Sequence, residues 1–252
     1  MILMCHALKI SHSHLAAHPE LFDKNNPIYK KYLERRKNHE PIAYILGFQP
    51  FLGLNIQVNK NVLIPRPETE YMAELAIKYL PKNKNTIIAD IGCGSGCLSI
   101  ALAHYLTKSK LFAVDPSKKA LNIAKLNANS HNLSKRIKFI KGDLFSKLHS
   151  KFDCIISNPP YIPTGEIDKL MPDVSHWEPK IALNGGKDGQ KFIKRIIADS
   201  PKHLKPNGFL LVEFGYKQSK AVEKLANKYF NCVEIIKDLS GIKRYLLARE
   251  KL

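Results

Sequence analysis

From Thr86 onward, short apolar runs rich in β-branched residues alternate with segments in which apolar residues recur every three or four positions. The first pattern predicts buried strands and the second predicts amphipathic helices. The predicted strands are TIIADIG (86–92), LFAVD (111–115), RIKFIKGD (136–143), FDCIISN (152–158), GFLLVEF (208–214), CVEIIKD (232–238) and KRYLLAR (243–249). The predicted helices are 97–106, 116–131, 189–204 and 217–230. The turn signal PNG (206–208) closes the third of them.

This order predicts an α/β fold with a mainly parallel sheet of seven strands. Most successive strands are separated by a helix, and a crossover of that length is what parallel pairing requires. The last two strands are separated only by a short turn at Ser240 and Gly241, so we expect them to be antiparallel.

Upstream of this region the pattern is less regular. Residues 26–39 (NPIYKKYLERRKNH) predict a polar helix, residues 41–58 an extended segment that forms a hairpin, and residues 69–80 a helix with acidic residues in its first turn. We therefore expect a small N-terminal helical region (1–40), a hairpin and linker (41–68) and a large α/β domain (69–252).

The amino-acid composition narrows the possible classes of protein only slightly. The chain of 252 residues is 44% hydrophobic and 25% charged, as is usual for soluble globular proteins. No apolar run is long enough to span a bilayer, and no signal peptide is evident, so we expect a cytoplasmic protein without membrane contact. The five cysteines form no CxxC pair and predict neither a disulfide framework nor a metal site.

The formal net charge is +18, and basic residues outnumber acidic ones both before and after residue 85. Such a field would attract polyanions such as nucleic acid or the ribosome. A lysine-rich bias that merely maintains solubility explains the charge equally well.

A glycine-rich loop follows the first strand and opens the next helix. Its residues are Asp90, Ile91, Gly92, Cys93, Gly94, Ser95 and Gly96. Glycines let a ligand approach the backbone, and the helix N-terminus offers free N–H donors. The third glycine of a dinucleotide-binding GxGxxG motif is missing, because position 97 is cysteine. NAD is therefore disfavoured.

Acidic residues also end the next two strands. Asp115 can accept the two hydroxyls of a ribose, and Asp143 can accept from an adenine amino group with Leu144 against the ring. Carboxyl ends of parallel strands share one edge of the sheet, where open α/β sheets bind ligands. Together with Asp90 and the glycine loop, these residues favour an adenosine-type ligand over isolated loop-capping carboxylates.

The fourth strand ends at the same edge with Asn158, Pro159, Pro160 and Tyr161. Two consecutive prolines fix the backbone and remove two donors, so this quartet can continue neither a sheet nor a helix. The order of glycine loop, two acids and NPPY resembles the class I methyltransferases that use S-adenosylmethionine, in particular those that methylate a planar nitrogen.

The chemistry of such a nitrogen explains the quartet. Its lone pair is delocalised, so a site helps by accepting both N–H hydrogens, here on the Asn158 side-chain oxygen and the Pro159 carbonyl. Tyr161 would stack on or flank the flat group. Methyl transfer from a sulfonium then depends on positioning and charge placement more than on a strong base.

NPPY alone does not choose among glutamine, adenine N6 and guanine N2. The stretch EPIAYILGFQPFLGLNIQVNKNVLIPRPETE (40–70), above all VLIPRPETE, resembles the release-factor glutamine methyltransferases of the HemK/PrmC family. WEPKIALNGGKDGQKF (177–192) and SGIKRYLLAR (240–249) also resemble segments of that family. About forty residues precede EPIAYILG, fewer than the family's N-terminal helical domain usually has.

The resemblance implies a class I methyltransferase fold and methylation of the N5 amide nitrogen of the glutamine in the Gly-Gly-Gln motif of class I peptide chain release factors. It implies cofactor contacts from residues 92–96, from Asp115 and from residues 143–144, catalysis by residues 158–161, and substrate recognition by the N-terminal region. We also expect Asp90 and Asn158 to contact the cofactor. We expect a monomer. The alternatives are an adenine-N6 or guanine-N2 methyltransferase acting on RNA or DNA, and a non-catalytic docking module.

Overall fold

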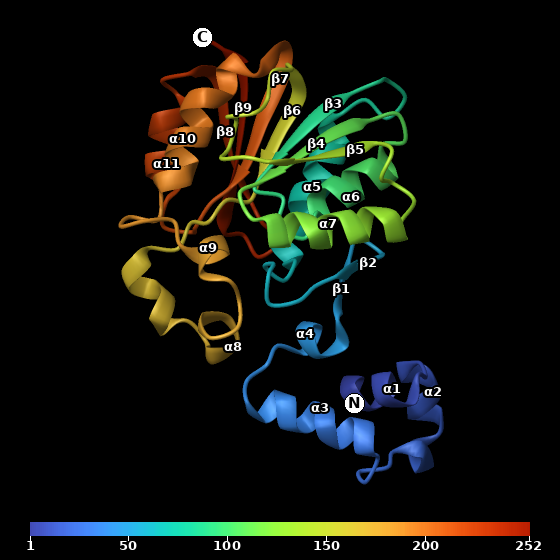
Figure 1. Cartoon of the computed structure of the whole chain (residues 1–252). Coiled ribbons are helices and arrows are strands. Elements are labelled where there is room, and N and C mark those ends of the chain that lie inside the picture. Colours follow the sequence, from blue (N-terminus) through green and yellow to red (C-terminus); the bar gives the residue numbers. More distant parts are fainter.

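The computed structural model describes all 252 residues and contains a large three-layer body with a smaller group of helices beside it (Figure 1). The sheet of the body has the order β5-β4-β3-β6-β7-β9-β8. Its strands are β3 (Ile87–Ile91), β4 (Lys110–Asp115), β5 (Ile137–Lys141), β6 (Phe152–Ser157), β7 (Leu204–Glu213), β8 (Phe230–Lys237) and β9 (Lys243–Lys251).

The seven-stranded, mainly parallel sheet is as the sequence predicts, and only β9 runs against its neighbours. β9 is inserted between β7 and β8, an order that the spacing alone does not reveal. β7 begins earlier than expected. The PNG at residues 206–208 lies inside it, at a register shift against β6, instead of ending the preceding helix.

Helices cover both faces of the sheet. One face packs against α5 (Pro67–Tyr79), α6 (Cys97–Tyr105) and α7 (Lys118–Ser130), and the other against α10 (Lys191–Asp199) and α11 (Ser219–Ala226). Alternation along the strands explains this arrangement, since Ile88 belongs to the first core and its neighbour Ala89 to the second. Because the strands are buried on both sides, they read as continuous apolar runs.

The connections set where a ligand can bind. From β3 the chain crosses through α6 to β4, whereas from β6 it crosses to β7 through the opposite helical layer. β3 and β6 are adjacent, so their carboxyl ends form the point at which the topology switches direction. Ligands of open α/β sheets bind at such a point. The segment after β6 adds η2 (Thr164–Lys169), α8 (Pro172–Ser175) and α9 (Lys180–Leu183), and η3 (Ser200–Lys202) precedes β7.

The hairpin is formed by β1 (Phe48–Phe51) and β2 (Leu54–Gln57), as expected. Phe51, Leu54 and Ile56 are buried in the core that contains α5 to α7, so the hairpin belongs structurally to the large body. The expectation of an extended chain is wrong for residues 42–46, which form α4 (Ile42–Leu46). Gly47, at φ +83°, ends this helix because it adopts the left-handed conformation without a side-chain clash.

The first forty residues form a separate cluster of helices: α1 (Ile2–Leu8), α2 (His12–Ala17), η1 (Pro19–Leu21) and α3 (Pro27–Lys37). The predicted helix at 26–39 is thus present, with Asn26 capping its first turn. Met4, Cys5 and Leu15 form the buried core of this cluster, which makes it much smaller than the cores of the sheet. None of the helices in the chain is both long and apolar enough to cross a membrane.

Candidate active site

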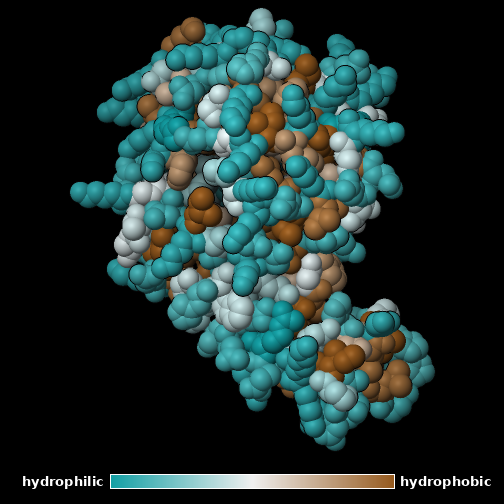
Figure 2. All heavy atoms as spheres, in the orientation of Figure 1, coloured by the Kyte–Doolittle hydropathy of each residue, from teal (hydrophilic) through white to brown (hydrophobic).

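A cavity of about 340 Å³ lies at the carboxyl edge of the sheet. Its walls come from the loops after β3, β4, β5 and β6, from residues 61–69 and from α10. In Figure 2 the surface is hollowed in this region, beside α10. The lining is largely apolar with a few polar groups, which is typical of a small-molecule site.

The glycine loop after β3 lies along the cavity. Gly92, Cys93, Gly94 and Ser95 line it, whereas Gly96 does not. Gly96 caps α6 at φ +80°, and a Cβ there would lie 3.0 Å from the Cβ of Ala124. Gly96 therefore supports the site by permitting the turn and the close approach of α7.

Asp90 is fully buried beneath this loop and does not line the cavity. Its Oδ2 accepts from the backbone N–H of Ser99 at 3.2 Å and from the Ser99 hydroxyl at 2.6 Å. Burial raises the pKa of Asp90 to about 7. The expected direct contact with a cofactor is thus not supported by its position, and Asp90 instead fixes the first turn of α6.

Asp115, at the end of β4, lines the cavity as expected. Its Oδ2 accepts from the N–H of Gly94 at 2.9 Å and its Oδ1 from the N–H of Ser117 at 2.8 Å. Burial raises the pKa of this carboxyl group. Each carboxylate oxygen retains a second lone pair, so Asp115 can hold the glycine loop and still accept ligand hydroxyls.

Asp143 and Leu144 also line the cavity, but Asp143 has a partner that the sequence does not indicate. The guanidinium of Arg195 on α10 donates to both of its oxygens, at 3.3 and 2.7 Å. This ion pair spans the rim of the cavity, and Phe192 adds an apolar wall from the same helix. Asp143 therefore shares its oxygens with Arg195, and each of them keeps a second lone pair that could accept from a ligand.

The quartet lies between two cavities. Asn158 and Pro159 line both the large cavity and a second one of about 90 Å³, Pro160 lines only the large one, and Tyr161 only the small one. The small cavity is completed by Leu63, Arg66, Ile162, Leu170, Val174, Ala182 and Leu183. The two cavities are therefore neighbours, with Leu63, Arg66, Asn158, Pro159 and Ala182 in the walls of both.

A line of hydrogen bonds runs behind the quartet. Asn158 Nδ2 donates to Thr69 Oγ1 at 2.9 Å, and Thr69 Oγ1 donates to Glu213 Oε2 at 3.0 Å. The Tyr161 hydroxyl donates to the other oxygen of Glu213 at 3.2 Å. Burial raises the pKa of Glu213 to about 7. The first turn of α5 and the ends of β6 and β7 are joined by these contacts.

The backbone of the quartet is held as firmly as its side chains. Gln218 Nε2 donates to the carbonyl of Tyr161 at 3.0 Å and to that of Gly189 at 3.1 Å. Ile162 exchanges backbone hydrogen bonds with residues 183–185, its N–H donating at 3.0 Å and its carbonyl accepting at 2.8 Å. The stretch 177–192 therefore supports the chain that leaves the quartet.

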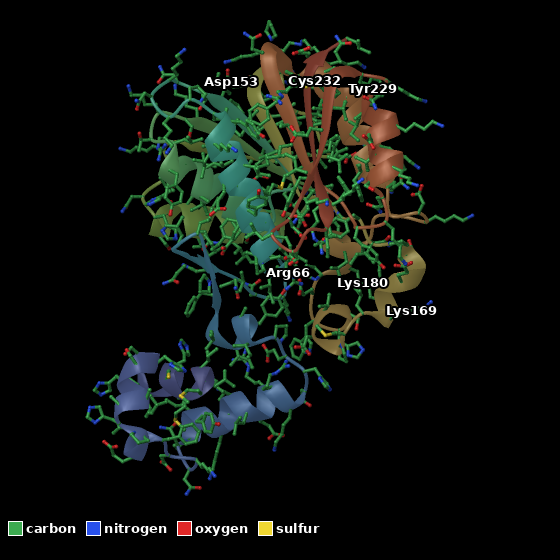
Figure 3. All side chains as sticks on the ribbon, turned by 180° about the vertical axis from the view of Figure 1, so that it is seen from behind. Arg66, Asp153, Lys169, Lys180, Tyr229 and Cys232 are labelled. Carbon is green, nitrogen blue, oxygen red and sulfur yellow. The ribbon has the colours of Figure 1, made fainter.

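The stretch VLIPRPETE meets the same segment from the other side. Arg66 forms an ion pair with Glu178, which also accepts from the N–H of Ile64 at 3.3 Å. Figure 3 shows Arg66 at the lower edge of the sheet, with Lys169 and Lys180 on the neighbouring lobe. Two segments that resemble the family, VLIPRPETE and residues 177–192, thus converge around the quartet although they are distant in sequence.

One amide joins the hairpin to the glycine loop. The side chain of Asn127, on α7, accepts from the N–H of Gln57 at 2.7 Å and donates to its carbonyl at 3.0 Å. The same amide donates to the carbonyl of Ser95 at 2.9 Å. Asn127 is fully buried, so these bonds are shielded from water.

Sequence reasoning missed Thr69, Glu213, Arg195 and Phe192 as site residues. A signal existed for Glu213, which ends an apolar strand as Asp90 and Asp115 do. Thr69 lies inside VLIPRPETE, where the pattern indicates only the beginning of the helix predicted at 69–80. Nothing in the pattern of α10 separates Arg195 from a solvated basic residue.

Two family models match the chain: the Methyltransferase small domain at residues 66–171 and the PrmC N-terminal domain at residues 1–47. Curated relatives described as release factor glutamine methyltransferases are similar over most of their length. That of Thermodesulfovibrio yellowstonii is 38% identical, covering 98% of this chain and 90% of its own. That of Clostridium botulinum is 42% identical, covering 88% and 80%.

Solved structures support the fold. A methyltransferase from Pyrococcus furiosus superposes with a TM-score of 0.61 at 18% identity, covering 88% of this chain and all of its own. A 16S rRNA N2 G1207 methyltransferase of T. thermophilus, described in complex with AdoMet and guanosine, gives a TM-score of 0.57 at 17% identity, covering 81% and 49%. At these identities the likeness concerns architecture alone.

Proposed function

The chain belongs to the release factor glutamine methyltransferases, and we propose that residues 158–161 are the groups with which it holds the substrate glutamine for methylation. The reaction transfers a methyl group from S-adenosylmethionine to the side-chain amide nitrogen of a glutamine in a release factor. The observation that carries the assignment is the position of Asn158 and Pro159 in the walls of both cavities.

The large cavity fits the cofactor. Asp115 has lone pairs left for two ribose hydroxyls, and Leu144 and Phe192 offer apolar surface to a base. The backbone from Gly92 to Ser95 lines the cavity at the start of α6, where N–H groups and the helix dipole favour polar ligand groups. S-adenosylmethionine supplies the methyl group on a positively charged sulfur.

The small cavity would receive the glutamine side chain. Because Asn158 Nδ2 is engaged by Thr69, its Oδ1 is available to accept one N–H of the substrate amide. The carbonyl of Pro159 would accept the other. With both hydrogens engaged, the nitrogen lone pair turns towards the methyl group, and positioning replaces the need for a strong base.

The test is Asn158→Ala, assayed with a purified release factor and labelled cofactor. We expect turnover to fall at least about 100-fold while cofactor affinity changes by only about twofold, since a transition-state contact is removed and Asn158 is only one of the many residues that line the large cavity. Asn59→Ala is the matched control, because Asn59 lies outside both cavities. A fully active Asn158→Ala enzyme would contradict the assignment.

We further propose that residues 1–40 dock the body of the release factor. The N-terminal cluster exposes the apolar side chains of Met1, Ile2, Leu21 and Ile28. It is also tied to the wall of the small cavity, because Arg36 pairs with Asp173 at 2.6 Å and Trp177 Nε1 donates to the carbonyl of Asn38 at 3.0 Å.

Ile28→Glu tests this docking role. We expect a higher KM for the intact release factor and an unchanged rate on a short peptide that carries the glutamine. Leu239→Glu is the control, because Leu239 is also apolar and is more exposed than Ile28, at 84% against 47%, but lies in the turn between β8 and β9. Equal behaviour of the two variants would remove the docking role.

Three broader features complete the proposal: action as a monomer, action in the cytoplasm where release factors function, and attraction to polyanions such as the ribosome through the net charge of +18. Sedimentation across a range of salt concentrations, with and without ribosomes, tests the first and third. Association that does not weaken with salt would contradict the electrostatic attraction.

A further inference from the structure

The line of hydrogen bonds behind Asn158 has one direction when Glu213 is ionised, that is, above its pKa of about 7. An ionised carboxylate can only accept, so the single hydroxyl proton of Thr69 then goes to Glu213. The oxygen of Thr69 is then left to accept, and the only group of Asn158 that can donate to it is the NH₂. The state of Glu213 therefore determines which end of the Asn158 amide faces the cavities.

We propose that Glu213 and Thr69 are positioning residues for methyl transfer: they hold the Asn158 amide with its oxygen, and not its NH₂, towards the substrate nitrogen. This inference rests on the proposed role of Asn158 as the acceptor of a substrate N–H. Neither positioning residue needs to touch the substrate. Glu213 lines neither cavity and Thr69 lines only the large one.

The burial of Glu213 favours this role over a purely structural one. Only 1% of the surface of Glu213 and 3% of that of Thr69 is exposed. The nearest positive charge, Arg244, is already engaged by Asp238 at 2.7 Å and faces Glu68 at 3.8 Å. An apolar residue of similar volume would hold β7 against α5 without the desolvation penalty of a carboxylate.

The opposite amide orientation would be unproductive. If the group at 213 could donate, the Thr69 hydroxyl would be free to donate to Asn158 Oδ1. The Asn158 NH₂ would then face the NH₂ of the substrate, and two donors make no hydrogen bond. Glu213→Gln permits this situation when its NH₂ faces Thr69, because one amide nitrogen replaces a carboxylate oxygen with little change in shape.

The experiment measures kcat and KM on a purified release factor, cofactor affinity by calorimetry, and Tm for three variants. We expect kcat to fall about 10- to 100-fold in Glu213→Gln and about tenfold in Thr69→Val, with cofactor affinity within about twofold of the parent enzyme. Thr69→Ser restores the hydroxyl and should retain kcat within about threefold.

Thr86→Val is the matched control for Thr69→Val. Thr86 is also 3% exposed, but its buried hydroxyl has no hydrogen-bond partner. Its removal changes the same number of atoms and should leave kcat unchanged. The double variant Thr69→Val/Glu213→Gln should be no less active than the less active of the two single variants. The two residues belong to one chain of hydrogen bonds, so breaking it twice should cost no more than breaking it once.

Normal kcat in both Glu213→Gln and Thr69→Val overturns the inference, as does a loss that Thr69→Ser does not recover. A fall in Tm and cofactor affinity that matches the fall in kcat would show a structural role only. If Glu213→Gln does not fold, Thr69→Val decides alone, since it leaves the carboxylate in place. An active Asn158→Ala enzyme overturns the proposed function itself, whereas an inactive one combined with normal positioning variants overturns only this inference.

Discussion

Removal of the Arg66 guanidinium should destabilise the protein in a pH-dependent way. Arg66→Met keeps most of the side-chain volume but leaves the buried carboxylate of Glu178 with only the N–H of Ile64, at 3.3 Å. Breaking a buried ion pair from one side costs about 3–5 kcal/mol. Because the side chain of Arg66 is 33% exposed, water already screens part of this attraction, and we expect about 2–3 kcal/mol at pH 7.

The sign of the pH dependence follows from Glu178. Burial raises the pKa of Glu178 and Arg66 lowers it. In folded Arg66→Met the pKa of Glu178 is therefore still higher than in the parent. The folded variant then holds a proton that the unfolded chain has released, and its stability falls as pH rises above the unfolded value of about 4.5. The deficit relative to the parent should therefore be small near pH 4.5 and full at pH 7.

Thermal unfolding at pH 5 and pH 7 measures this effect. At pH 7 we expect the Tm of Arg66→Met to fall by about 5–10 °C, and the double variant Arg66→Met/Glu178→Gln to recover part of that loss. Arg249→Met is the control, because Arg249 pairs with Glu234 at 3.8 Å on the surface and lies 5.4 Å from the Tyr79 ring centroid, contacts that together should cost at most about 1 kcal/mol. Equal losses at both pH values, without recovery in the double variant, would refute the reasoning.

Three further substitutions test the large cavity and its support. Asp115→Asn should weaken cofactor binding about 10- to 100-fold by calorimetry, because it replaces an acceptor of hydroxyl groups by a donor, and unchanged affinity would remove its ribose role. Gly189→Ala should abolish turnover in the methylation assay, since φ at Gly189 is +71° and a Cβ there would collide with the Tyr161 carbonyl. Gly165→Ala is the control and should remain fully active, because a Cβ at Gly165 meets no neighbouring atom. Asp90→Asn should gain about 1–3 kcal/mol in free energy of unfolding relative to the parent between pH 5 and pH 8 in urea titrations. The pKa of Asp90, raised to about 7, makes the parent lose stability as pH rises between about 4 and 7, and the variant lacks this loss; a pH-independent difference would contradict this.

The fold could be predicted from the sequence wherever one local pattern controlled the outcome. The strands of the parallel sheet are buried on both faces, so their apolar runs are unmistakable. Residues 42–46 were assigned to an extended segment because five mostly apolar residues fit a strand and one helical turn equally well. The place of β9 between β7 and β8 depends on packing between distant segments, which no local pattern records.

Those site residues that lie at the ends of strands could be predicted from the sequence. Asp115, Asn158 and the glycine loop could be assigned to one edge because parallel strands bring their carboxyl ends together. The engagement of Asp143 by Arg195 could not be foreseen, since it depends on the rotation of α10 about its axis. The same holds for the contact of Thr69 with Glu213, which are 144 positions apart in the chain.

The buried amide of Asn127 makes the hairpin and the glycine loop one mechanical unit. A transplanted loop or hairpin whose backbone followed a different path at position 95 or 57 would leave donors or acceptors of this amide unmatched in a place that water cannot reach. Chimeric enzymes built from this scaffold should therefore exchange residues 48–57 and 92–96 together with position 127, and a junction drawn between the hairpin and the sheet would cut through the support of the cofactor site.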